Sequence, residues 1–180
     1  EMVLEKAKMI PMGDPWEDPC VFTGPVANAS AHKSILAAIE TGKREGKLLL
    51  GGHALDRPGY YIAPTIFDGV RNDMRIAREE IFGPVLSAIT FTEEDEAIRI
   101  ANDTMYGLAA GIWTDDVNRA HRAARAIKAG VVWVNTFDTG DISATLSRCS
   151  RRCISRRPAN SAMRKEIWLI GLKRSSSVVI

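Results

Sequence analysis

The stretch that decides the fold runs from Val85 to Val134 and reads VLSAITFTEEDEAIRIANDTMYGLAAGIWTDDVNRAHRAARAIKAGVVWV. Three apolar, β-rich runs, 85–91, 108–113 and 131–134, alternate with two segments whose apolar residues repeat at helical spacing. The last run, VVWV, has no polar residue, as is typical of a strand buried in a parallel sheet. Strand, helix, strand, helix and strand in this order predict an α/β fold, in which helices flank a mostly parallel sheet.

The residues before this stretch continue the alternation with shorter and less regular elements. We expect a helix over residues 1–9 and a longer one over 30–45, with Ser30 as its capping residue and a glycine directly after it as the stop. Strands are expected over 47–50 and 60–67. The second contains a proline, which cannot donate a backbone hydrogen bond, so we expect an edge strand or an irregular one.

The charge of the chain changes sign along its length. The 180 residues are 46% hydrophobic and 26% charged, as in an ordinary globular domain, and the formal net charge is +2. Residues 1–143 carry 15 Lys and Arg against 21 Asp and Glu, whereas residues 144–180 carry nine against a single acid, Glu166. We therefore expect one domain over 1–143, followed by an irregular, basic tail over 144–180 that is rich in Arg and Ser.

The composition also excludes some locations. No apolar run reaches the ~20 residues that cross a bilayer. The first residues, EMVLEKAKMI, lack the basic-then-apolar pattern of a signal peptide. Three cysteines in a chain of this length do not suggest a disulfide-stapled secreted module. We expect a cytoplasmic protein with no membrane association.

The cysteines do not point to a reactive or metal-binding site. Cys20 follows Asp18 and Pro19, whereas reactive thiols need electropositive surroundings. Cys149 and Cys153, in CSRRC, lack the second ligand pair that zinc requires, and the three histidines are scattered. The sequence has no GxSxG elbow, no GxGxxG and no P-loop. We expect no metal site and no catalytic nucleophile.

The segment REEIFGP, residues 78–84, is the most informative short motif. Because Glu79 and Glu80 are adjacent, an extended chain turns one carboxylate inward and the other to solvent. A carboxylate held beside Phe82 and a rigid Gly-Pro turn suits a polyol ligand such as a ribose. From spacing alone, an ordinary solvated acidic turn is the commoner explanation, since charge runs usually lie on solvated faces.

Longer segments resemble a known family. In order, REEIFGPVLSAITF, ANDTMYGLAAGIWT and AGVVWVN closely resemble the C-terminal half of the NAD(P)-dependent aldehyde dehydrogenases. The earlier segments GPVANASAHKSILAAIETGKREGKLLLGG and GYYIAPTIF are similar to those that precede them in the family. The resemblance covers residues 1–143 and is greatest to the betaine-aldehyde or aminoaldehyde branch. It implies a partial aldehyde dehydrogenase catalytic domain.

The resemblance implies a reaction and a set of site residues. In the family a cysteine thiolate forms a thiohemiacetal with an aldehyde, hydride passes to the coenzyme, and a glutamate activates the water that releases the carboxylate. By match to EEIFGP, Glu80 binds the hydroxyls of the nicotinamide ribose and Phe82 packs near the nicotinamide. By match to VNTF, Asn135 and Phe137 reach the substrate channel. The implied cofactor is NAD or NADP, the substrate is an aldehyde, and the family assembles as homo-oligomers.

The resemblance also implies what we do not expect in these residues. In the family the nucleophilic cysteine lies in a GQxC-type motif that, like the glutamate base and the Rossmann domain, precedes the point matched by Glu1. Cys20 does not align with that cysteine. We therefore expect no catalytic residue in this chain, and no dehydrogenase activity from the 180 residues alone.

The tail departs from the family. After the matched DIS, the family continues with a Pro-Phe-Gly-Gly segment, a Lys-Gln-Ser-Gly stretch and a last strand that joins the oligomer, and residues 144–180 match none of these. Because glycine codons begin with GG, reading one base early often gives Arg or Trp, so we expect a frameshifted, truncated or degraded reading frame.

Two non-catalytic alternatives remain open. The basic tail can act as a binding module that holds nucleic acid or acidic surfaces through counterion release. Nucleic acid is the less favoured ligand, because the tail has a single aromatic residue, Trp168, on which a base could stack. The other alternative is a scaffold that docks on intact dehydrogenase subunits.

Overall fold

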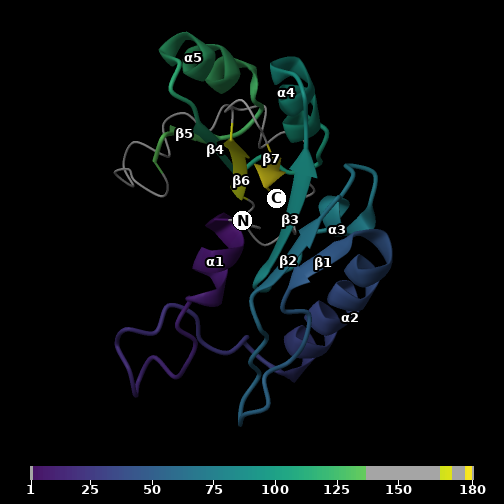
Figure 1. Cartoon of the computed structure of the whole chain (residues 1–180), viewed down its shortest axis with the longest axis vertical. Helices are drawn as coiled ribbons and strands as arrows, with labels where there is room; N and C mark the ends of the chain where they lie inside the picture. The colour runs from purple at the N-terminus through teal and green to yellow at the C-terminus, as the bar shows by residue number, and fades with distance from the viewer. Residues whose placement is uncertain (1, 137–166, 172–176, 180) are drawn as a thin grey trace, which may run out of the picture. The chain divides into compact units, whose positions relative to one another are not determined.

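A computed structural model of the chain describes residues 2–136, 167–171 and 177–179 (Figure 1). The chain divides into two compact units, Glu1–Ala88 and Ile89–Ile180. Both units contain helices and strands in mixed order along the chain, which confirms the predicted α/β class. The following paragraphs treat each unit by itself.

The first unit contains three helices and three strands among its described residues. They are α1 (Met2–Lys8), α2 (Ala29–Glu45), β1 (Lys47–Leu50), β2 (Thr65–Asp68), α3 (Arg75–Arg78) and β3 (Val85–Thr90), which runs across the unit boundary. Strand β2 pairs antiparallel with β1 and parallel with β3. Helix α2 lies against β1 and β2 (Figure 1). The strand expected over 60–67 is thus confined to the residues after the proline.

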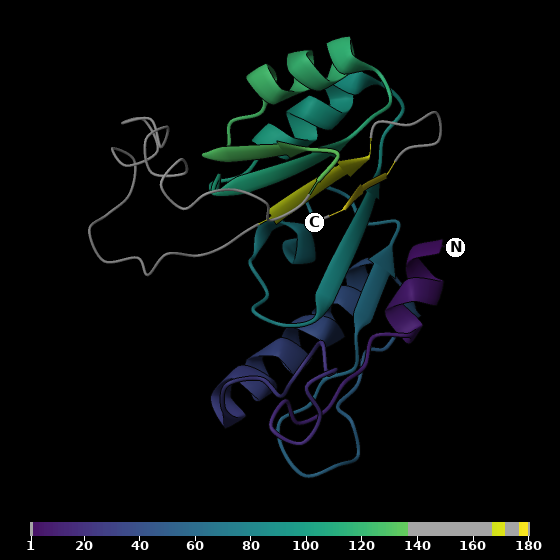
Figure 2. The ribbon, with the colours of Figure 1, turned by 90° about the vertical axis from the view of Figure 1, so that its left-hand side faces the viewer.

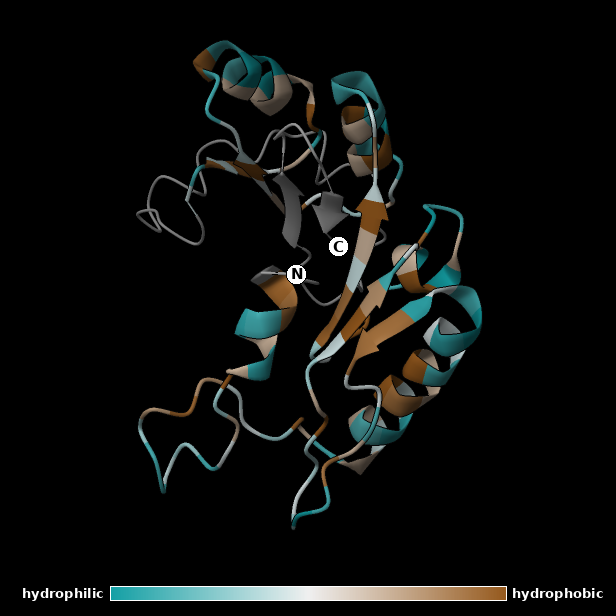
Figure 3. Ribbon diagram, in the orientation of Figure 1, coloured by the Kyte–Doolittle hydropathy of each residue, from teal (hydrophilic) through white to brown (hydrophobic). Residues whose placement is uncertain are grey.

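Helix α2 forms where an asparagine caps it and one face can be buried. The Asn28 side chain accepts a hydrogen bond from the Ala31 backbone N–H at 2.9 Å. The prediction that Ser30 caps the helix is therefore wrong, because Asn28 already provides the acceptor and Ser30 lies within the first turn. Ile35 and Ile39 are buried, and Figure 3 shows the hydrophobic residues of α2 turned toward the strands.

The core of the first unit lies between α2 and the strands. Phe67 of β2 and Ile39 of α2 are fully buried, and Ile62 is 1% exposed. Burying a side chain of this size contributes about 1.5–3 kcal/mol of stability. The candidate site described below lies beside the same helix, α2.

The second unit contains the predicted strand–helix–strand stretch. Its described elements before the tail are α4 (Glu94–Asn102), β4 (Ala109–Trp113), α5 (Val117–Ala126) and β5 (Val131–Val134). Strands β4 and β5 pair in parallel, and α4 and α5 cover the same face of them (Figure 2). Ala110 and Ile112 of β4 are fully buried, as the absence of polar residues in this strand predicts.

Two residues of α4 connect it to α5 and to the residues that follow α5. The Glu94 carboxylate of α4 forms ion pairs with Arg119 at 3.2 Å and Arg122 at 3.0 Å, both on α5. The Asn102 side chain donates to the Ala126 carbonyl at 2.9 Å and accepts from the Lys128 backbone N–H at 2.7 Å. The end of α4 is thereby fixed against the connection from α5 to β5.

Within the basic tail the structure describes two strands, β6 (Ile167–Gly171) and β7 (Ser177–Val179). Strand β6 pairs in parallel with β4 and antiparallel with β7. The tail was expected to be irregular, but these eight residues are rich in β-branched and aromatic types, which favour strands. With β2–β3 and β4–β5, the β4–β6 pair agrees with the predicted, mostly parallel pairing.

Candidate functional site

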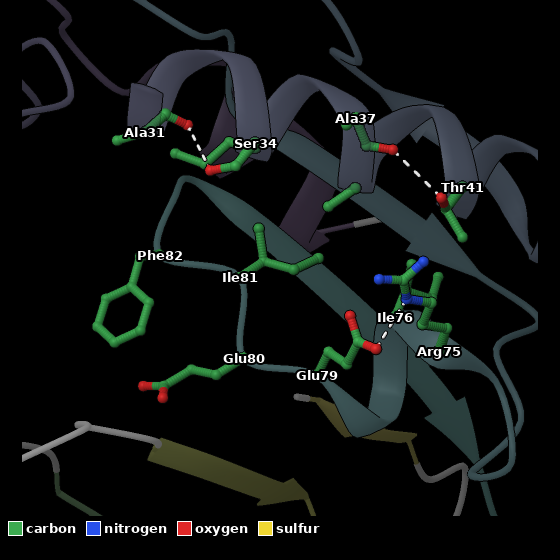
Figure 4. Close-up of a pocket in the computed structure, with 12 residues that line it drawn as sticks. Ala31, Ser34, Ala37, Thr41, Arg75, Ile76, Glu79, Glu80, Ile81 and Phe82 are labelled. Atoms are coloured by element: carbon green, nitrogen blue, oxygen red, sulfur yellow. Dashed lines mark hydrogen bonds and ion pairs between the residues drawn. The ribbon is translucent and has the colours of Figure 1, made fainter. Parts of the chain in front are cut away.

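A pocket of about 390 Å³ lies in the first unit, between α2 and the segment from α3 to Phe82 (Figure 4). Small-molecule sites commonly occupy about 300–1,000 Å³. One wall is the face of α2 formed by Ala31, Ser34, Ile35, Ala37, Ala38 and Thr41, and the other is formed by Arg75, Ile76, Glu79, Glu80, Ile81 and Phe82. The segment that the sequence singled out therefore lines a cavity.

The two adjacent acids of this segment point in opposite directions. The Glu79 carboxylate is solvent-exposed and forms an ion pair with the Arg75 guanidinium at 2.8 Å. The Glu80 side chain extends away from that pair (Figure 4), and each of its carboxylate oxygens exposes less than 1 Å² to solvent. The extended backbone at Glu79, with φ −104° and ψ 132°, explains the alternation. The orientation expected from the sequence is thus observed.

An exposed aromatic ring lies beside the Glu80 carboxylate. Phe82 is 61% exposed, and it projects from the same side of the segment as Glu80 (Figure 4). The next residue, Gly83, packs against α2 so closely that an added Cβ would lie 2.7 Å from Ile35 Cγ2. The carboxylate and the ring are therefore presented together by a segment that is anchored on the helix.

Apart from Ile35, the α2 wall of the pocket consists of small residues. The Ser34 hydroxyl donates to the Ala31 carbonyl at 3.0 Å, and the Thr41 hydroxyl donates to the Ala37 carbonyl at 3.2 Å (Figure 4). Each hydroxyl oxygen keeps a lone pair that can accept a hydrogen bond from a ligand. Sequence reasoning missed this wall, although Ala31, Ser34, Ala38 and Thr41 recur at helical spacing and mark a face without bulky side chains.

The other predicted site residues lie in the second unit or outside the described residues. Asn135 follows β5 with a φ of 53°, a left-handed conformation that asparagine tolerates better than most residues. Its side-chain oxygen accepts from the Thr114 N–H, and its amide nitrogen donates to the Thr114 carbonyl, both at 2.9 Å. The Asn135 amide is thus engaged in joining the ends of β4 and β5. Phe137 lies outside the described residues.

The cysteines and possible metal ligands form no further site among the described residues. Cys20 is exposed, and its backbone N–H donates to the Asp18 carboxylate at 2.8 Å. Cys149 and Cys153 lie outside the described residues. In the part of the chain that the structure describes, no group of three or more His, Cys, Asp and Glu is placed to hold a metal ion. No helix there is long and apolar enough to cross a membrane.

Comparison with known proteins identifies the family. A sequence profile described as the aldehyde dehydrogenase family matches residues 1–147. The chain belongs to the aldehyde dehydrogenase family. Among curated proteins, it is 50% identical over 140 residues to a long-chain-aldehyde dehydrogenase of Acinetobacter sp, an alignment that covers 76% of this chain and 27% of that protein.

Solved structures of aldehyde dehydrogenases give the same result. The chain is similar, with a TM-score of 0.75 and 48% identity, to the indole-3-acetaldehyde dehydrogenase AldA of P. syringae in complex with NAD+ and IAA, covering 78% of this chain and 29% of AldA. A 1-pyrroline-5-carboxylate dehydrogenase from Thermus with bound NAD gives a TM-score of 0.73 and 41% identity, with 77% of this chain and 27% of that chain covered. The chain thus spans little more than a quarter of the length of these aldehyde dehydrogenases.

Proposed function

We propose that this chain forms one wall of the nicotinamide-ribose site of an NAD(P)-dependent aldehyde dehydrogenase, in which Glu80 binds the ribose hydroxyls and Phe82 packs against the nicotinamide. The observation that carries the proposal is the opposite orientation of Glu79 and Glu80 at the pocket. Extended backbone explains why the two side chains diverge, but a solvated acidic turn would leave both carboxylates in water, whereas both oxygens of Glu80 are shielded from solvent. A ligand site accounts for the shielding, because a carboxylate shielded from water forms stronger hydrogen bonds.

The chemistry of Glu80 fits a ribose. The two oxygens of an ionised carboxylate accept hydrogen bonds from two neighbouring hydroxyls, and bonds to a charged acceptor contribute about 1.5–3 kcal/mol. Both oxygens are shielded from solvent in the present structure. Ribose binding therefore requires the groups that cover them to move aside, and the ligand hydroxyls then replace those groups as the surroundings of the carboxylate.

The other residues of the pocket supply shape and orientation. The exposed ring of Phe82 offers an apolar face to a planar pyridine ring, and offset stacking of aromatic rings contributes about 0.5–1.5 kcal/mol beyond the buried area. Ser34 offers a hydroxyl on the opposite wall, and the alanines of α2 leave room for the sugar. When bound, NAD+ or NADP+ supplies the hydride acceptor for oxidation of an aldehyde.

We further propose that the 180 residues do not complete the reaction by themselves. Reactive thiolates lie beside cationic side chains or helix N-termini, whereas the backbone of Cys20 bonds to a carboxylate in an exposed loop. Purified chain mixed with NAD+ and an aldehyde should therefore give no increase in NADH absorbance. The origin of the tail in a shifted reading frame is also a proposal, and sequencing the encoding DNA tests it.

The ribose proposal is tested with nicotinamide mononucleotide, which carries the nicotinamide and one ribose only. Saturation-transfer NMR on the 180-residue chain should show transfer to the ribose protons of this probe. Glu80→Gln should weaken its binding about tenfold, which corresponds to 1.4 kcal/mol. Glu79→Gln removes the same charge one residue away and should have a smaller effect, because the Glu79 carboxylate is paired with Arg75. Equal losses of affinity in the two variants would show that Glu80 acts only through its charge, and would refute the proposal.

A further inference from the structure

The first turn of α3 lacks a capping side chain of its own. Met74, at the N-cap position, makes no side-chain hydrogen bond to the helix. The backbone N–H of Ile76 instead donates to the carboxylate of Glu45 at 3.1 Å, in a part-buried contact between residues 31 positions apart. Glu45 is the last residue of α2. The cap of α3 is therefore supplied by another helix.

Helix α3 depends on such outside contacts. It has four residues, and a single helical turn is unstable by itself because nucleation is unfavourable. Helix α3 packs against α2 at Gly42, where an added Cβ would lie 2.7 Å from Phe67 Cζ and 3.2 Å from Ile76 Cγ2. A glycine within a helix costs about 1 kcal/mol relative to alanine. Here it permits α2 to approach α3 closely enough for Glu45 to reach Ile76.

Helix α3 leads directly into the residues that line the pocket, so its orientation determines where they lie. The Glu79 backbone N–H donates to the Arg75 carbonyl at 2.9 Å and ends the helix, while the two side chains form their ion pair at 2.8 Å. Glu80 is the next residue. On the other side of the segment, Gly83 packs on Ile35. The residues that line the pocket are thus held on α2 at both ends, by Glu45 and Gly42 before them and by Ile35 after them.

From these contacts we infer that Glu45 is a positioning residue: its carboxylate caps α3 and thereby fixes the segment Glu79–Phe82 at the pocket. The effect on ribose affinity rests on the function proposed above, whereas the effect on the segment does not. Glu45 itself does not line the pocket. Its removal should therefore act on the ligand only through the segment.

The test is hydrogen exchange of the full 180-residue chain, measured on the peptide that covers residues 74–84. Glu45→Ala should speed amide exchange in this peptide about tenfold or more, since it removes a hydrogen bond to a charged group. Glu45→Gln keeps a side-chain acceptor and should restore most of the protection. Glu40→Ala is the matched control: Glu40 lies on the same helix but pairs with Lys43 at 2.6 Å and should leave the peptide unchanged.

A second readout separates this inference from the proposed function. Binding of nicotinamide mononucleotide should weaken in Glu45→Ala and recover in Glu45→Gln. Unchanged exchange in Glu45→Ala would overturn the inference, and so would unchanged affinity in a chain that binds the probe. If the unsubstituted chain does not bind the probe, the proposed function fails, and exchange alone judges Glu45. Faster exchange in β2 as well would show that Glu45→Ala unfolds the first unit. The Glu45→Gln variant then decides: if it is folded but its amides in residues 74–84 exchange fast, the result counts against the inference.

Discussion

Replacing Asn135 by alanine should destabilise the second unit more than an exposed position normally allows. The Asn135 side chain makes two hydrogen bonds of 2.9 Å to the backbone of Thr114, a residue that is 3% exposed. Alanine removes both and leaves a buried N–H and a buried carbonyl without this partner. It also places at a φ of 53° a residue whose side chain cannot hydrogen-bond to stabilise the left-handed backbone.

The magnitude follows from these losses. Two hydrogen bonds contribute about 1 kcal/mol each, and the left-handed backbone costs alanine about 1 kcal/mol or more. Glycine at the same position recovers only the backbone part. Aspartate keeps the acceptor for the Thr114 N–H but loses the donor. We expect Asn135→Ala to lose about 3–4 kcal/mol in unfolding free energy, Asn135→Gly about 1 kcal/mol less than that, and Asn135→Asp the smallest amount.

Urea unfolding followed by tryptophan fluorescence measures the series, because Trp133 lies in β5 two residues before the substitution. For a chain of this size the alanine variant should also melt about 6–16 °C lower. The reasoning is refuted if Asn135→Ala stays within about 0.5 kcal/mol of the unsubstituted chain, the range of an ordinary surface change. It is also refuted if glycine is worse than alanine. Either result would mean that the Asn135 side chain is not needed to join β4 and β5, and would favour the substrate-channel role predicted from the sequence.

Two further predictions concern the pocket and the response to acid. Gly83→Ala should lower the free energy of unfolding by about 1–3 kcal/mol and weaken binding of nicotinamide mononucleotide, because the new Cβ meets the buried Ile35 side chain. Adding Ile35→Val should recover part of the lost stability, and simple additivity of the two changes would contradict the contact. The pKa of Asp116 is held below its ordinary value of 3.8, mainly by backbone hydrogen bonds from Arg119 and then Asn118, so the stability it provides is present above that pH and is lost as the pH falls through the lowered value. Asp116→Asn should accordingly flatten the acid end of a melting-temperature profile, and an identical acid limb would count against the cap.

The sequence predicted the elements that depend on local pattern. Strands β1 and β5 and the end of α2 match the expectations, because apolar runs and a stop glycine act over a few residues. Helix α3 was missed for the opposite reason. Its four residues carry no cap, and the group that caps them lies 31 positions earlier in the chain. No local signal reports such a contact.

The candidate site was predictable in part for the same reason. The alternation of Glu79 and Glu80 is a property of extended backbone and could be expected from adjacency. That Ser34 and the alanines of α2 line the same cavity as Glu80 depends on tertiary packing. The role of Asn135 as a clasp on Thr114 likewise depends on a neighbour 21 positions away that only the fold brings close.

The central claim is that Glu80 binds the ribose of the coenzyme in a working aldehyde dehydrogenase. It is tested most directly by grafting residues 1–136 into the long-chain-aldehyde dehydrogenase of Acinetobacter sp, in place of the residues they align with, and measuring the KM for NAD+ with a saturating aldehyde. We predict that the hybrid enzyme is active, that Glu80→Gln raises its KM for NAD+ about tenfold, and that Glu40→Gln does not. An active hybrid in which Glu80→Gln leaves the KM for NAD+ unchanged would contradict the claim.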